Sequence, residues 1–315
     1  MTPADRGALP ADRGALPADR GALPAPPSAG GPAQEDGTFG ERFLARAGTL
    51  GRLCVGMDPH AGILEAWGLP VTVDGLREFS RICVDAFADT ACVVKPQVAF
   101  YEAFGSAGIA VLEDALAALR TAGTLVIADA KRGDIGSTMA GYATAWLGED
   151  SPLRADAVTV SPYLGLGSLD PVLEVGERTA RGVIVLAATS NPSGPQFQRL
   201  GTGEHGTGPT VAQTVVDSVS ALNSAHVRHG RAGNVGVVVG ATVTDPPVLD
   251  AVGGMVLMPG VGAQGGSAAD VARIAGGAAR LTSPSMSRSI LSAGPDTGAL
   301  RRAVLGSSAE FPPAV

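Results

Sequence analysis

Short apolar runs alternate with amphipathic helical patterns from residue 39 to residue 306. Apolar runs that end in polar or glycine-rich turns are typical of buried parallel strands, and parallel strands need a crossover, usually a helix, between them. The sequence predicts strands at residues 53–58, 92–97, 125–131, 157–161, 182–190, 235–242, 255–259 and 279–287. It predicts helices at residues 74–88, 109–122, 136–147, 169–178, 210–229, 246–251, 268–275 and 297–305.

Eight strand–helix units predict a (β/α)8 TIM barrel, a fold that typically takes about 250 residues. An open doubly wound sheet is the alternative, but eight units without a break in composition favour the barrel. Ser283-Pro284-Ser285 is poor strand sequence. The eighth strand is therefore predicted from its place in the series of strand–helix units more than from its own residues. We expect one catalytic barrel domain over residues 38–306 and a C-terminal tail over residues 307–315.

The N-terminal segment has a different composition. Residues 4–24 are three copies of Ala-Asp-Arg-Gly-Ala-Leu-Pro. Proline and glycine in every repeat exclude a continuous coiled-coil helix. We therefore expect residues 1–37 to be a disordered, low-complexity extension without a catalytic part.

Composition also narrows the partners and the compartment. The net charge is −7 and no basic stripe is present, which argues against nucleic acid as a partner. Cys54, Cys83 and Cys92 show no CxxC spacing and indicate a reducing interior. The sequence shows no signal peptide, and no apolar run approaches the roughly 20 residues that a membrane-spanning helix needs. We therefore expect a cytoplasmic protein without a membrane partner.

Lysine is rare in this chain. Of the 23 Lys and Arg residues, only Lys95 and Lys131 are lysines. An ammonium can give up a proton, whereas a guanidinium does so very poorly. The alternative is that these two lysines persist by chance in a chain that otherwise uses arginine. Because both lie at ends of predicted strands, we interpret them as functional.

The third predicted strand ends in Asp129-Ala130-Lys131, and Arg132-Gly133-Asp134 follow it and lead into the next helix. Strand alternation directs Asp129 and Lys131 to the same side. Charges at the end of an apolar strand are costly to desolvate unless they pair or do chemistry. An ordinary loop ion pair is the alternative. Because barrel sites lie at the C-terminal ends of strands, Asp58 and Lys95 on earlier strand ends favour a shared active site.

A glycine-rich segment, residues 260–266, follows the seventh predicted strand and reads G-x-G-x-x-G. The acidic residue that a dinucleotide site needs about 20 positions later is missing. A phosphate site made by backbone N–H groups and closed by Arg288 fits better, and a plain turn is the alternative. The four histidines show no zinc-ligand spacing, so no metal is expected.

Together these segments resemble one family. The block from Asp129 to Ile135 resembles the D-x-K-x-x-D-I signature of orotidine 5′-phosphate decarboxylases. Similar blocks follow in the family's order over residues ~39–306: Gly56-Met57-Asp58-Pro59, Val94-Lys95-Pro96-Gln97, Thr189-Ser190-Asn191-Pro192 and residues 259–266. The Lys-Pro-Gln and Thr-Ser-Asn-Pro segments are similar to those of the longer bacterial, type 2 subgroup. Ser287-Arg288-Ser289 departs from the Gly-Arg-Ser of other subgroups.

The resemblance implies a carboxy-lyase that converts orotidine 5′-phosphate to UMP, the last step of de novo pyrimidine nucleotide synthesis, without metal or organic cofactor. It implies a homodimer with shared active sites, in which Asp134 and Thr138 reach the neighbouring subunit's site. Ribose hydroxyls would bind Asp58 and Lys95. The remaining implied roles are a charged network of Lys95, Asp129, Lys131 and Asp134, pyrimidine and loop contacts of Ser190 and Gln264, and a phosphate contact of Arg288.

The implied chemistry suits these residue types. Loss of CO₂ leaves a carbanion at C6 of the pyrimidine with no conjugated sink, so the protein must stabilise it electrostatically. A fixed ammonium provides that charge and then the proton; we assign this to Lys131, with Lys95 as the alternative. Two other functions stay open: a metal-dependent sugar-phosphate decarboxylase or aldolase whose carboxylates bind Mg²⁺, and a non-catalytic phosphate-ligand binding module.

Overall fold

A computed structural model describes residues 37–314, so the predicted N-terminal extension lies almost wholly outside the described residues. Eight parallel strands pair in chain order, and β8 pairs with β1 to close a barrel. The strands are β1 (Cys54–Met57), β2 (Val93–Pro96), β3 (Leu125–Arg132), β4 (Ala157–Val160), β5 (Gly182–Ala188), β6 (Val235–Val239), β7 (Val256–Pro259) and β8 (Thr282–Met286). The predicted (β/α)8 barrel is confirmed, including its eighth strand.

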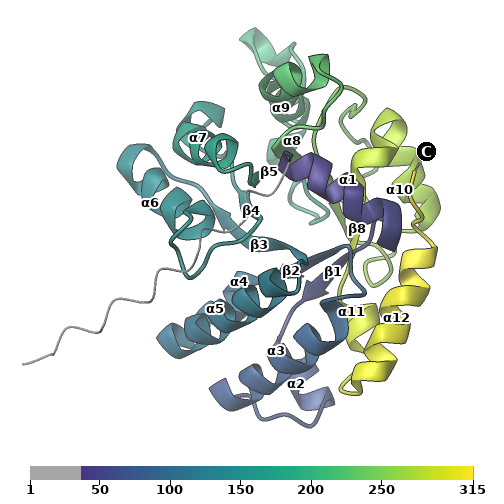
Figure 1. Ribbon diagram of the computed structural model, residues 1–315. Coiled ribbons are helices and arrows are strands. Elements are labelled where there is room, and N and C mark those ends of the chain that lie inside the picture. The colour runs from purple at the N-terminus through teal and green to yellow at the C-terminus, as the bar shows by residue number, and fades with distance from the viewer. Residues whose placement is uncertain (1–36, 315) are drawn as a thin grey trace, which may run out of the picture. The chain divides into compact units, whose positions relative to one another are not determined.

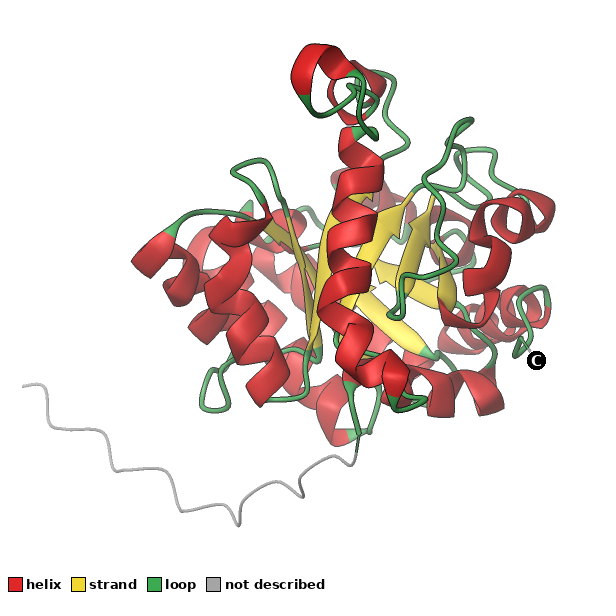
Figure 2. Ribbon diagram, turned by 90° about the horizontal axis from the view of Figure 1, so that it is seen from above, coloured by secondary structure: helices red, strands yellow, loops and turns green. Residues whose placement is uncertain are grey.

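Helices surround this barrel (Figures 1 and 2). The α-helices are α1 (Phe39–Leu50), α2 (Ala61–Ala66), α3 (Val73–Phe87), α4 (Val98–Glu102), α5 (Gly105–Thr121), α6 (Gly136–Leu147), α7 (Asp170–Arg178), α8 (Pro195–Gln198), α9 (Val211–Arg228), α10 (Ala268–Ala275), α11 (Arg288–Leu291) and α12 (Thr297–Ala309). Short 3₁₀ turns are η1 (Leu166–Leu169), η2 (Glu204–Gly206) and η3 (Gly276–Leu281). None of the helices within residues 37–314 is long and apolar enough to cross a bilayer.

The predicted helix at residues 246–251 is wrong, because this segment connects β6 to β7 without a helix. Pro246 and Pro247 lack backbone N–H donors and disfavour a helix at the preceding residue. The next N–H, that of Val248, instead donates to Oε1 of Gln213 on α9 at 2.8 Å. The last helix also runs farther than expected: α12 ends at Ala309, and Phe311 beyond it is buried.

Helix α1 was not predicted, and it lies across one end of the barrel (Figure 1). Phe39, Phe43 and Ala47 are spaced four residues apart, so they share one helical face, and all three are buried. They pack in one cluster with strand residues such as Ile127 and Ile184. This cluster fills the barrel interior, while the larger apolar core packs the outer helices against the strands.

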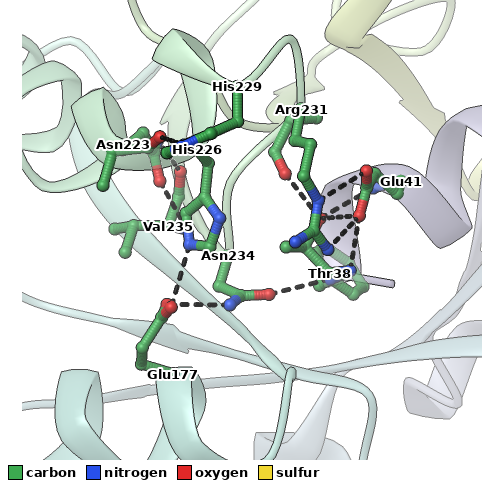
Figure 3. Close-up of polar contacts among 12 residues, drawn as sticks. Thr38, Glu41, Glu177, Asn223, His226, His229, Arg231, Asn234 and Val235 are labelled. Atoms are coloured by element: carbon green, nitrogen blue, oxygen red, sulfur yellow. Dashed lines mark hydrogen bonds and ion pairs between the residues drawn. The ribbon is translucent and has the colours of Figure 1, made fainter. Parts of the chain in front are cut away.

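Polar contacts hold the start of α1 on the barrel (Figure 3). The backbone N–H of Phe39 donates to Oδ1 of Asn234 at 2.8 Å, and Nδ2 of Asn234 donates to Glu177 at 2.8 Å. Glu41 forms an ion pair with Arg231 at 2.7 Å, and the hydrogen bond from Arg231 lowers the pKa of Glu41 to about 2. The N-terminal end of the barrel is therefore closed by an anchored helix, which leaves the C-terminal end for the site.

If α1 seals the barrel interior, Phe43→Ala should lower the free energy of unfolding by about 3–5 kcal/mol, because it removes a fully buried ring and leaves a cavity. Phe197→Ala is the matched control, since that ring is 45% exposed, and it should cost less than about 1 kcal/mol. Denaturant unfolding of both variants measures the difference. Equal costs would show that α1 does not contribute to the core.

Candidate active site

A cavity of about 570 Å³ opens at the C-terminal ends of the strands. Its walls come from the ends of β1, β2, β3 and β8 and from the loops after β5 and β7. Seven of the site residues that the sequence indicated line it: Asp58, Lys95, Asp129, Lys131, Ser190, Gln264 and Arg288. The fold thus brings together side chains that are far apart in the chain.

Asp129 on β3 is the centre of the charged cluster. Its Oδ2 accepts hydrogen bonds from Nζ of Lys95 at 3.0 Å and from Nε2 of Gln97 at 2.9 Å. Its Oδ1 accepts from Nζ of Lys131 at 2.6 Å and from Oγ1 of Thr159 at 2.9 Å. Each carboxylate oxygen therefore receives one charged and one neutral donor, which fixes the carboxylate in one orientation.

The ionisation of Asp129 and Lys95 depends on two opposing effects, which are burial and the opposite charges next to them. Burial alone would raise the pKa of Asp129, but the ammonium groups of Lys95 and Lys131 outweigh it and hold that pKa below its ordinary value. Burial alone would lower the pKa of Lys95, but the carboxylates of Asp129 and Asp58 outweigh it and raise that pKa. Both groups stay ionised at neutral pH.

The two lysines differ in their access to the cavity. The Lys95 side chain is 7% exposed, whereas that of Lys131 is 45% exposed. Lys131 has φ +49°, in the left-handed region that a residue with a side chain rarely adopts. Its N–H donates to Oγ1 of Thr159 at 3.0 Å, and the β3–β4 pairing shifts register between Ala128 and Arg132. The strained backbone at Lys131 is therefore held in place by β4.

The sequence places Gln97 and Thr159 at strand ends that face the site, but it predicts no contact of either residue with Asp129. Both are neutral, and their role depends on strand register. Gln97 forms a parallel bridge with Asp129 just after β2, and Thr159 lies on β4. Their position in the sequence indicates that they lie near the site, because both are polar residues at the C-terminal ends of the strands next to β3.

Asp134 and Thr138 do not join the cluster within the chain. Asp134 lies between β3 and α6, is half-buried, and its Oδ1 accepts the N–H of Ile135 at 2.8 Å. Thr138 is an exposed residue of α6. Neither lines the cavity of its own chain. The part of the predicted network that a single chain forms consists of Lys95, Asp129 and Lys131.

The loop after β7 supplies one wall of the cavity. Gly260, with φ +99°, accepts the N–H of Gly266 at 3.1 Å, and Ser190 donates to Oε1 of Gln264 at 2.8 Å. The N-terminus of α10 beyond it is occupied by a capping box of Ser267 and Asp270. An anion at this wall would therefore meet loop N–H groups and Arg288, rather than the end of α10.

No group of three or more His, Cys, Asp or Glu side chains placed to hold a metal ion is found among residues 37–314. The positive charge at the cavity is supplied by Lys95, Lys131 and the exposed Arg288.

Asp129→Asn should destabilise the protein by about 3–5 kcal/mol at neutral pH, because it leaves the buried ammonium of Lys95 without its nearest counter-charge. Asp74→Asn is the control, since the Asp74–Arg77 pair is largely exposed and should contribute less than about 1 kcal/mol. Denaturant unfolding at pH 7 measures both. Similar losses in the two variants would contradict the central position of Asp129.

The contribution of Asp129 to the free energy of unfolding should depend on pH. Because the folded-state pKa of Asp129 lies below its ordinary value of 3.8, its ionised form contributes stability that is complete above that value and is lost as the pH falls toward the folded-state pKa. The gap in unfolding free energy between wild type and Asp129→Asn should therefore narrow below about pH 4. A gap that stays constant down to about pH 3 would exclude this linkage.

Comparison with known proteins identifies the family to which this chain is similar. The sequence profile of the orotidine 5′-phosphate decarboxylase / HUMPS family matches residues 51–303. Orotidine 5′-phosphate decarboxylase of Corynebacterium glutamicum is 59% identical over 275 residues, which cover 87% of this chain and 98% of the relative. The Corynebacterium efficiens protein of the same name is 60% identical over 275 residues, with 87% and 97% covered.

Solved structures lead to the same family. A Streptomyces avermitilis protein provisionally assigned the same activity has a TM-score of 0.83 at 46% identity, and the match covers 87% of this chain and 95% of that one. Leishmania donovani OMP decarboxylase has a TM-score of 0.67 at 29% identity, with 87% and 97% covered. The chain belongs to the orotidine 5′-phosphate decarboxylase / HUMPS family.

Proposed function

We propose that this protein decarboxylates orotidine 5′-phosphate to UMP, the last step of de novo pyrimidine nucleotide synthesis. Relatives about 60% identical over nearly their whole length are orotidine 5′-phosphate decarboxylases. The observation that carries the proposal is the Lys131 ammonium, which is fixed by Asp129 at 2.6 Å and lines the cavity.

The reaction needs a positive charge at one carbon. When the C6–CO₂ bond of the pyrimidine breaks, its electron pair stays on C6 and cannot delocalise into the ring. An ammonium already held at that position stabilises the carbanion without reorganisation and then transfers a proton to it. No metal or organic cofactor is required for these two steps.

Lys131 suits the role of proton donor better than Lys95. Lys95 is almost fully buried, and its ammonium is stabilised by Asp129 and Asp58, which raises its pKa and makes it a poor acid. Lys131 is the more exposed of the two at the cavity wall. In this scheme Lys95 fixes Asp129 through the carboxylate oxygen that Lys131 does not contact. Together with Asp58, Lys95 also binds the ribose hydroxyls.

The rest of the substrate is bound by the opposite walls. Arg288, exposed at the cavity rim, binds the phosphate together with loop N–H groups after β7. Ser190 and Gln264, which already bond to each other, lie where the pyrimidine and the closing loop would meet. Phosphate binding far from C6 supplies free energy for loop closure and alignment.

A homodimer with shared sites would account for Asp134 and Thr138, which lie outside the cavity of their own chain. Apolar side chains are exposed beside them at the same end of the barrel: Ile135 at 62%, Tyr163 at 74% and Leu164 at 52%. Exposed apolar side chains of this size, gathered on neighbouring loops, indicate an interface. Asp134 of one subunit would then complete the charged network of the other.

The three cysteines are unpaired and buried, which agrees with a protein of the reducing cytoplasm.

Purified protein mixed with orotidine 5′-phosphate and EDTA should consume the substrate, as followed by absorbance, at the rate seen without EDTA. Loss of turnover on chelation would instead support the metal-dependent sugar-phosphate decarboxylase or aldolase that the sequence left open. UMP binding without any turnover would support the non-catalytic binding module.

Lys131→Ala should lower kcat by at least about 10³-fold, because it removes both the stabilising charge and the proton. The thermal unfolding temperature of the variant serves as the control for folding. Arg288→Ala is the comparison variant: it should raise KM for the substrate more than it lowers kcat. Near wild-type kcat in Lys131→Ala would remove Lys131 from the mechanism.

Mixing inactive Lys131→Ala and Asp134→Ala chains tests the shared site. If a site takes Lys131 from one subunit and Asp134 from the other, each mixed dimer holds one intact site, and random pairing should restore about one quarter of wild-type activity. Absence of any rescue, once subunit exchange has been verified, would show that each site is self-contained.

A further inference from the structure

Two polar atoms at the cavity have no hydrogen-bond partner within residues 37–314. They are Oδ1 of Asp58, just after β1, and Oγ of Ser287, just after β8, and solvent hardly reaches either atom. Both residues line the cavity. An unsatisfied buried polar atom costs about 1–3 kcal/mol, so each such atom calls for an explanation, and a bound ligand is one.

The two atoms flank the same point on β1. A Cβ placed on Gly56 would lie 2.6 Å from Cβ of Ser287, 3.0 Å from its Oγ and 3.4 Å from Oδ1 of Asp58. The pairing of Cys54 with Ser285 and of Val55 with Met286 brings Gly56 and Ser287 side by side. Glycine at position 56 therefore leaves the space that the Ser287 side chain occupies next to Asp58.

The chemistry of the pair identifies the group that it can bind. An ionised carboxylate only accepts hydrogen bonds, whereas a serine hydroxyl also donates one. A phosphate oxygen would be repelled by Asp58. A sugar hydroxyl satisfies both atoms, because it can donate to Asp58 and accept from Ser287.

We propose that Ser287 is a specificity-determining residue that, together with Asp58, binds one ribose hydroxyl of the nucleotide. The inference rests on the proposed function and adds to it a residue that the family resemblance did not supply, since other subgroups carry glycine at this place. In this chain the hydroxyl of Ser287 provides a donor for the sugar that a glycine lacks.

The test compares UMP with its 2′-deoxy and 3′-deoxy analogues by isothermal titration calorimetry. Ser287→Ala should weaken UMP binding about 3- to 10-fold, the effect of one hydrogen bond. For the analogue that lacks the bound hydroxyl, wild type and variant should have the same affinity. Ser287→Gly should behave like Ser287→Ala, and Ser106→Ala, an exposed serine outside the cavity, should bind all three nucleotides like wild type.

Unchanged UMP affinity in both Ser287 variants would overturn the inference. An equal loss for UMP and both deoxy analogues would also overturn it, because the contact would then not involve a sugar hydroxyl. These results differ from failure of the proposed function, in which the wild-type protein itself neither binds UMP nor consumes orotidine 5′-phosphate.

Discussion

The carboxylate of Asp129 lies between two ammonium groups, and the rest of the site depends on this contact. Alone, a carboxylate this deeply buried would tend to take up a proton, and the ammonium of Lys95 would tend to lose one. Together they stay charged, and the donors Gln97 and Thr159 fill the remaining acceptor positions. The protein thereby keeps a fixed positive charge at the Lys131 end of the cluster.

The barrel makes this arrangement possible because its two ends differ. At the N-terminal end, α1 covers an apolar interior with Phe39 and Phe43. At the C-terminal end, parallel strands deliver polar side chains from distant parts of the chain to one cavity. The strained backbone of Lys131 is held there by the hydrogen bond that its N–H donates to Thr159 on β4, so the stability of the barrel maintains an unfavourable local conformation.

Much of this could be predicted from periodicity and position. The apolar runs gave strands close to those observed, and the predicted helices at residues 136–147 and 268–275 coincide with α6 and α10. The predicted helix at residues 246–251 is wrong because Pro246 and Pro247 remove two backbone N–H donors from its first turn and disfavour helical backbone before them. The contacts of Gln97 and Thr159 with Asp129, and the place of Ser287 beside Asp58, depend on strand register, which a single sequence does not show.

The proposed reaction depends on the ammonium at position 131. The most direct measurement is turnover by Lys131→Cys before and after aminoethylation, which rebuilds a lysine-like ammonium at that one position. The native cysteines should not react, because all three are buried and burial raises the pKa of their thiols. If the ammonium at position 131 stabilises and protonates C6, Lys131→Cys should be inactive and aminoethylation should restore turnover. A fully labelled enzyme that stays as inactive as the unlabelled variant would contradict it.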